Sequence, residues 1–88
     1  IVIPHDPPHG TAADLLPNGK HVGSPAVRAF VERTQPAVCL SGHIHEARSV
    51  DCLGATTVVN PGPLAAGGYA FIGLRDGALA AELRRIGD

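Results

Sequence analysis

The chain has 88 residues and a formal net charge of −1, a length that predicts one small domain. A chain of this size buries only about 60–65% of its extended surface, which argues against a large active-site cavity of its own. The near-zero charge gives no electrostatic case for binding nucleic acid or an anionic membrane. No apolar run approaches the roughly 18 residues of a membrane span and no targeting segment is visible, so a cytoplasmic globular protein is the default expectation.

The first quarter of the chain predicts a strand and a long loop. The apolar run at residues 1–3 is typical of a strand, which Pro4 should end because proline has no backbone N–H to donate. Residues 4–23 are rich in proline and glycine and carry three of the five histidines. Loops longer than about 12–15 residues in a compact domain are usually functional or disordered. We interpret this one as functional.

A single helix is predicted next. Ser24 suits the N-cap and Pro25 the first helical position, and the helix should run to about Thr34 before Pro36 stops it. Its apolar residues recur at helical spacing, which predicts one buried stripe made of Val27, Phe30, Val31 and Thr34.

The remainder of the chain is predicted to be mostly strands. Residues 37–41 form a short apolar segment typical of a buried strand, and two more strands are expected at residues 49–53 and 56–60. Asn60-Pro61-Gly62-Pro63 predicts a tight turn. A hairpin should follow from residues 69–74 and 79–86, joined at Asp76-Gly77.

Five residues receive simple interpretations from their neighbours. Cys39 and Cys52 lie in apolar surroundings, so we expect both to be reduced and buried. Asp14 and Arg48 are expected to be surface charges. His9 is expected to lie on the loop surface.

Histidines follow two of the predicted strands. His43 and His45, after Gly42, occupy positions i and i+2, which in extended backbone lie on one side about 6.5–7 Å apart. Two such imidazoles can clamp one ion or each hold one of two ions about 3.5–4 Å apart, and the spacing favours the second arrangement. Hydrogen bonding to the backbone is the alternative. His5 makes metal binding the better interpretation, because it ends the first strand and ligands gather at the strand ends of α/β sheets.

The ordered combination of His5-x-Pro7-Pro8, Gly42-His43-x-His45 and Asn60-Pro61-Gly62 resembles the calcineurin-like metallophosphoesterases. The closer resemblance is to their small prokaryotic members, in which a segment like residues 19–24 precedes the helix. It covers roughly residues 1–74. The resemblance implies an α/β fold, a four-layer α-β-β-α sandwich with a dinuclear metal centre. Residues 1–88 would form its C-terminal half, mostly strands with one helix.

By this resemblance His5 and His43 are ligands of one metal and His45 is a ligand of the other, the two divalent ions being Mn, Fe, Ni or Zn. The family's carboxylate motifs, Asp-x-His and Gly-Asp-x-x-Asp, and its Gly-Asn-His motif are absent from the 88 residues. In the family they precede the lone histidine. The chain also opens on a strand-like run and contains no methionine, so we expect a domain whose N-terminal half lies upstream. Three imidazoles without a bridging carboxylate cannot hold two dications against their repulsion, so the isolated chain should be inactive.

Four further residues are weaker candidates. His21, beside Lys20, is a candidate to contact a substrate phosphate, with a solvated loop histidine as an equal alternative. Asn60 is a candidate for the edge of the substrate site, although Asn-Pro is also ordinary turn chemistry. Asp6 and Glu46 each follow a proposed ligand and are candidates to orient an imidazole. Solvated carboxylates are the simpler interpretation of both.

The leading hypothesis is a metal-dependent phosphoesterase acting on a phosphorylated small molecule or other phosphate ester. A non-catalytic scaffold with the same fold and a small single-zinc protein are the alternatives. A first strand without its neighbour leaves unpaired backbone groups. We therefore expect the chain to pair with its N-terminal half or with a second copy through the exposed sheet edge.

Overall fold

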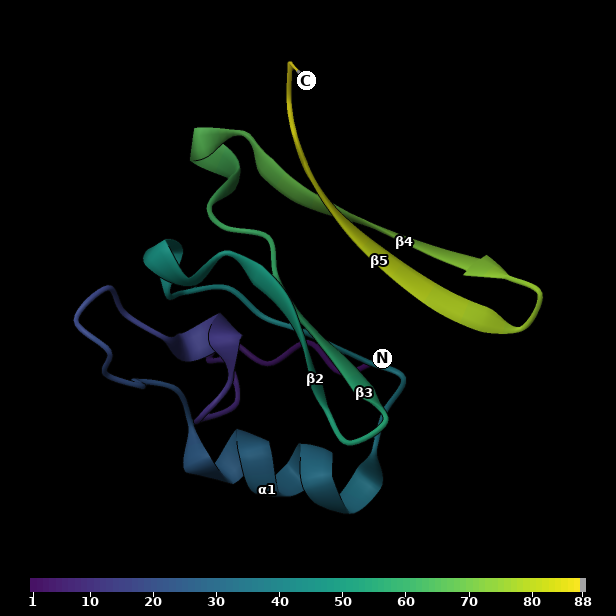
Figure 1. The fold of residues 1–88 in the computed structure, drawn as a ribbon, viewed down its shortest axis with the longest axis horizontal. Coiled ribbons are helices and arrows are strands. Elements are labelled where there is room, and N and C mark those ends of the chain that lie inside the picture. Colours follow the sequence, from purple (N-terminus) through teal and green to yellow (C-terminus); the bar gives the residue numbers. More distant parts are fainter. Residues whose placement is uncertain (88) are drawn as a thin grey trace.

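The computed structural model describes residues 1–87 and shows an α/β fold, mostly strands with one α-helix. Figure 1 shows the helix on one side of a three-stranded sheet and a two-stranded hairpin on the other. The helix is α1 (Pro25–Thr34), and the sheet holds β1 (Val38–Leu40), β2 (Ser49–Leu53) and β3 (Thr56–Asn60). The hairpin is β4 (Gly68–Arg75) and β5 (Ala78–Arg85), and three short 3-10 turns complete the set: η1 (Ala12–Asp14), η2 (His45–Ala47) and η3 (Leu64–Ala66). None of the helices within residues 1–87 is both long enough and apolar enough to cross a membrane.

Helix α1 begins and ends where the sequence predicts. The Ser24 hydroxyl accepts the backbone N–H of Val27 at 3.1 Å, and Gln35 ends the helix in a left-handed conformation. The buried stripe is narrower than predicted, because only Val31 is fully buried while Phe30 is 40% exposed and Thr34 is exposed. The helix therefore covers the sheet with one edge of its apolar face.

The sheet has the order β1-β3-β2, with β1 parallel and β2 antiparallel to β3. The predicted first strand is present as an extended segment that bridges to β1 at Val2: the Val2 N–H donates to Val38 O at 3.0 Å, and the Leu40 N–H donates to Val2 O at 2.9 Å. This segment is parallel to β1, so it, β1 and β3 run the same way. Their carboxyl ends therefore lie at one edge of the sheet, where ligand sites of open α/β sheets form.

Small aliphatic side chains fill both sides of the sheet. Against the helix, Val31 packs with Ala13, Cys39, Leu53 and Val58. Val38 and Val59 alternate to the opposite face and are also fully buried. The hairpin on that side turns at Asp76-Gly77, where both residues have positive φ, as the predicted Asp-Gly turn requires.

Three simple interpretations of single residues are wrong. Cys52 is exposed, because it alternates outward on β2, although Cys39 is buried and both thiols are free as expected. Asp14 has a fully buried side chain, since surrounding backbone N–H groups take up its charge. Arg48 is half-buried, because its guanidinium donates to the carbonyls of Pro61 and Arg84 at 3.0 and 2.9 Å and ties the hairpin to the sheet.

Candidate metal centre

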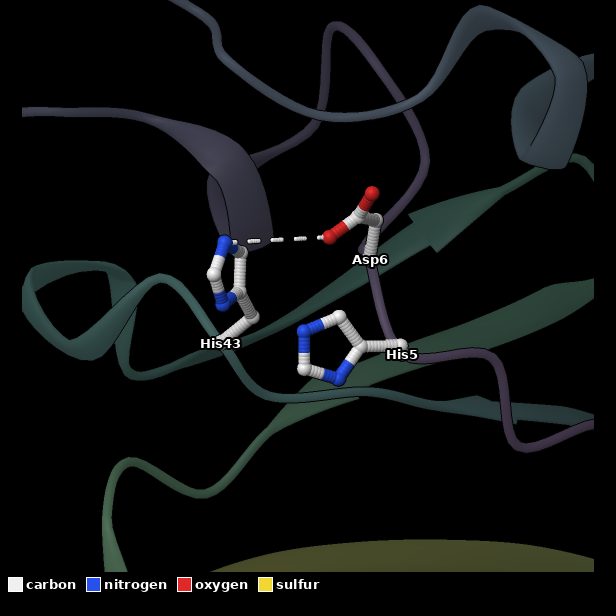
Figure 2. A group of neighbouring side chains, drawn as sticks. All are labelled: His5, Asp6 and His43. Carbon is white, nitrogen blue, oxygen red and sulfur yellow. Dashed lines mark ion pairs between the residues drawn. The ribbon is translucent and has the colours of Figure 1, made fainter.

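His5, Asp6 and His43 converge at the edge where the parallel strands end (Figure 2). His5 and Asp6 follow the first extended segment, and His43 follows β1. One ligand atom from each lies within 4.8 Å of the other two. The rings of His5 and His43 are 4.5 Å apart, and His43 Nε2 is 3.9 Å from Asp6 Oδ1. We call these three residues the histidine–aspartate trio.

A tight turn aims His43 at its neighbours. The Ile44 N–H donates to Gly42 O at 2.6 Å, which closes a three-residue γ-turn with His43 at its centre. His43 has φ +62°, in the left-handed region that residues with a Cβ seldom adopt. A γ-turn with positive φ at its centre is rare and strained. Such strain persists only where the surroundings over-determine it, and it gathers at functional sites.

His5 and His43 of the trio border an open hollow of about 460 Å³. Ile3 and Leu40 supply apolar walls, and Ser41 and Pro61 also line it. Ser41 is 5% exposed, and its hydroxyl has no hydrogen-bond partner within residues 1–87. Unpartnered buried hydroxyls are rare in native proteins and commonly mark a place for water or an ion.

The donor set of the trio fits one divalent ion. Two neutral imidazoles with one carboxylate suit Zn, Fe, Ni or Mn. Bonds of about 2.0–2.2 Å around one tetrahedral ion bring ligand atoms to about 3.4 Å from one another. The ligand atoms of the trio lie within 4.8 Å of one another, so an ion would draw them closer by up to about 1.4 Å. The side chains of His43 and Asp6 are about half exposed (53% and 48%), so an ion can enter from solvent.

His45 lies outside the trio. It begins η2, is exposed, and lines a second hollow with Glu46, Arg48 and Gly62. Pro61 borders both hollows, so the Asn-Pro-Gly turn is common to the two. The structure thus brings together the two histidines that the resemblance assigns to one metal and places the third elsewhere. Its assignment to a second metal stays a prediction.

The long loop is organised around the buried Asp14 carboxylate. Backbone N–H groups of Gly10, Thr11 and Gly23 donate to it at 2.9–3.0 Å, and His21 Nδ1 lies 2.6 Å from Oδ1. Burial acts to raise the pKa of Asp14, but these hydrogen bonds outweigh it, so the pKa lies below its ordinary value.

Asp14 also orients His21, the candidate substrate contact. Because an ionised carboxylate only accepts hydrogen bonds, Nδ1 of His21 carries the proton in this contact and Nε2 is left for another partner. The ring of His9 lies 5.9 Å from that of His21. His9 is exposed as predicted.

Asn60, the other candidate substrate contact, is fully buried at the carboxyl end of β3. Its amide nitrogen donates to Ala13 O at 3.1 Å and to Ile44 O at 2.9 Å. Its amide oxygen accepts the Gly62 N–H at 3.0 Å. All three partners are backbone groups of this chain.

Asp6 is the member of the trio for which the sequence favours a solvated carboxylate, and the structure places it beside the two histidines. The sequence signal for Asp6 was its position between His5 and the rigid Pro7-Pro8 pair, whose two prolines are buried. Two prolines fix the exit of the backbone, which holds the neighbouring carboxylate beside the imidazole. Glu46 lines the hollow of His45, and no hydrogen bond from its side chain is present among the described residues.

An α/β fold with a histidine–aspartate cluster at its strand ends places the chain in the class of candidate metal-dependent proteins. Over residues 1–83 the sequence matches the metallophosphoesterases of the calcineurin superfamily, and the chain belongs to this family. It is 42% identical over 67 residues to an uncharacterized protein of Methanocaldococcus jannaschii, a match that covers 72% of this chain and 31% of that protein. A crystal structure of a relative superposes with a TM-score of 0.74 at 30% identity and covers 94% of this chain. The chain spans about a third of the length of the relatives it matches, 31% in both cases.

Proposed function

We propose that the chain supplies the histidine part of a metal-dependent phosphoesterase centre that hydrolyses phosphate mono- or diesters. The observation that carries the proposal is the convergence of His5, Asp6 and His43 at the strand ends of a chain that belongs to the metallophosphoesterases. The trio would hold one divalent ion, and His45 would serve a second. Manganese is the first ion to test among Mn, Fe, Ni and Zn.

Bound metal supplies a nucleophilic hydroxide at neutral pH and neutralises charge on the phosphate. The chain's own residues would do the rest. Asp14 would hold His21 so that Nε2 can meet a phosphate oxygen of the substrate, either as acceptor for a protonated ester or, when the ring is protonated, as donor. Ile3 and Leu40 would shield one side of the trio from water. Carboxylates that bridge two ions would come from an N-terminal half or from a second copy, and the location would be the cytoplasm.

The test is metal-dependent hydrolysis by the full protein. Nitrophenyl phosphate and bis-nitrophenyl phosphate distinguish mono- from diesterase activity, each with Mn²⁺, Ni²⁺ or Zn²⁺ added. We expect His43→Ala to lower both the metal content and the rate by at least about 100-fold, because a metal ligand is lost. His9→Ala, also an exposed histidine, should retain both. Full metal occupancy without turnover of either ester would overturn the enzymatic proposal and favour the scaffold.

A single-ion site is the second candidate, since the trio alone offers two imidazoles and one carboxylate, a common donor set for one zinc. Zinc titration of the 88-residue chain separates the two. One ion per chain, lost on His5→Ala and retained on His45→Ala, would support the single site. A requirement for His45 and for a second ion would support the dinuclear centre.

A further inference from the structure

We infer that Asn60 is a positioning residue for the metal centre, whose amide fixes the His43-Ile44-His45 segment from inside the protein. The inference rests on the proposed metal centre and replaces the predicted contact with substrate. Asn60 touches none of the trio side chains through its hydrogen bonds, and acts through the backbone that carries His43 and His45.

The hydrogen bonds of the Asn60 amide are committed to the protein. Both bonds from its nitrogen run to carbonyls, Ala13 O and Ile44 O, and its oxygen accepts the Gly62 N–H. The side chain is 0% exposed, so a substrate cannot reach it. A buried amide with its hydrogen bonds made is stable, whereas removal of its donors would leave the buried Ala13 carbonyl and the partly buried Ile44 carbonyl without that partner.

The carbonyl that Asn60 holds is the one between the two predicted ligands. Ile44 O accepts the Asn60 amide at 2.9 Å and the Ala47 N–H at 3.1 Å, so it is fixed from β3 and from η2. The γ-turn centred on His43 ends at Ile44, the residue whose carbonyl Asn60 holds. A strained turn needs a neighbour that over-determines it, and the Asn60 bond supplies one.

The same amide links the metal-ligand segment to the long loop. Ala13, whose carbonyl is the second acceptor, is in η1 next to Asp14, and Asp14 holds His21. Asn60 therefore ties η1 and the residues before η2 to the end of β3 at one point. The segment that carries His43 and His45 and the candidate phosphate contact His21 are thus fixed relative to each other.

The test is a pair of matched amide-to-acid substitutions. Asn60→Asp keeps an acceptor for the Gly62 N–H and replaces the donor to Ala13 and Ile44 with an oxygen. Gln35→Glu is the control, because the Gln35 amide also donates to two carbonyls, Val31 O at 2.9 Å and Leu53 O at 3.2 Å, and accepts one backbone N–H. Gln35 lies at the end of α1, outside the trio and its hollow.

Zinc affinity and the absorption spectrum of bound Co²⁺ are measured for the wild type and both variants, at matched fractions of folded protein. We expect Asn60→Asp to weaken zinc binding by about 10–100-fold, as for other residues that orient ligands, and to change the cobalt spectrum. Gln35→Glu should leave both unchanged. If the two variants have equal zinc affinity and equal cobalt spectra, the role of Asn60 is overturned while the metal centre stands. A wild type that binds neither ion would overturn the metal centre and this inference with it.

The wild type provides a second test that does not depend on the folding of a variant. Zinc should shift the side-chain NH₂ resonances of Asn60, because Ile44 O moves when His43 binds the ion, and should leave those of Gln35 in place. Asn60 resonances that stay fixed while the His43 ring resonances move would overturn the inference.

Discussion

At the scale of single residues, His43 holds a backbone conformation that glycine adopts more easily. The left-handed region costs a residue with a Cβ about 1–2 kcal/mol. Glycine avoids this cost, but it loses more conformational entropy on folding, which offsets part of the benefit. We predict that His43→Gly raises the free energy of unfolding by about 0.5–1 kcal/mol while it abolishes metal binding. Urea unfolding and zinc titration measure the two effects.

The matched control is His45→Gly, because His45 has negative φ within η2. Glycine at such a position should lower the free energy of unfolding by about 0.5–1 kcal/mol. Opposite signs for the two substitutions identify strain at His43. A loss of stability in both would show that the γ-turn is not strained.

The buried Asp14 carboxylate contributes to the stability of the long loop. Asp14→Asn should lower the free energy of unfolding by about 2–3 kcal/mol at pH 7, since the charged acceptor of three backbone N–H groups and His21 is lost. The folded pKa lies below the ordinary 3.8. The stabilisation is therefore complete above about pH 4 and is lost as the pH falls through the folded pKa.

Chemical unfolding of the wild type and Asp14→Asn across pH 2–7 tests both parts. The difference between them should be constant above about pH 4 and should shrink as the pH falls below that value. Asp76→Asn, an equal change of charge in the exposed hairpin turn, should shift stability by less than about 0.5 kcal/mol. A difference for Asp14→Asn that does not depend on pH would contradict the account.

Residue chemistry explains which roles could be predicted from the sequence. The proximity of His5 and His43 could be predicted, because each follows a predicted strand and ligands gather at the strand ends of α/β sheets, while their role as metal ligands stays a prediction. The role of Asp14 could not be predicted, since the donors to its carboxylate are backbone N–H groups of a loop whose path no sequence pattern fixes. For Asn60, turn chemistry predicted the bond to the Gly62 N–H, but not the two donations across 47 and 16 residues.

At the scale of elements, local signals were strong where caps and turn residues punctuate the chain. The bounds of α1, β2 and β3 agree with the prediction, and each bound of the two hairpin strands lies one residue from its predicted position. The 3-10 turns η1 and η2 were missed, because three residues carry too little periodicity to register. Tertiary hydrogen bonds hold both turns in place: the Ala12 N–H donates to the Asp51 carboxylate, and the Asn60 amide nitrogen donates to the Ala13 and Ile44 carbonyls.

Arg48 gives the prediction at the element scale. Its guanidinium spans from Pro61 O to Arg84 O and so joins the hairpin β4–β5 to the three-stranded sheet. An isolated two-stranded hairpin is marginal in water. We predict that Arg48→Ala speeds amide hydrogen exchange in β5 by about tenfold or more, the equivalent of about 1.4 kcal/mol of local stability, and leaves β1 and β3 protected.

Arg33→Ala, which removes an exposed guanidinium from α1, is the control and should leave exchange in β5 unchanged. Equal acceleration across both sheets in Arg48→Ala would mean that the arginine stabilises the whole fold and does not specifically hold the hairpin.

At the scale of the whole molecule, the site exists because three segments run parallel. The sequence predicts strands at residues 1–3, 37–41 and 56–60, but their pairing and direction come from contacts between residues far apart in the chain. The resemblance to a known family implied the layered α/β architecture, but the pairing and direction of these strands were seen first in the structure. Once the direction is fixed, His5, His43 and Asn60 must meet at one edge, since each follows or ends a parallel segment.

The edge of the sheet beside β1 is exposed. The segment at residues 1–3 borders β1 and leaves Ile1 75% and Ile3 71% exposed. Apolar side chains beside unpaired backbone invite pairing with another chain. We therefore predict that the 88-residue chain self-associates as its concentration rises, as analytical ultracentrifugation would measure.

Ile3→Lys should weaken this association by at least about tenfold, because a lysine on an edge opposes strand pairing. Ala65→Lys adds the same charge on η3, where the residue is exposed and away from that segment in the chain, and should leave the association unchanged. A wild type that stays monomeric at millimolar concentration would contradict the prediction. Equal weakening by both lysines would assign the association to net charge. Loss with Ile3→Lys alone would assign the association to the sheet edge beside the candidate metal centre, where Ile3 lines the hollow with His5 and His43.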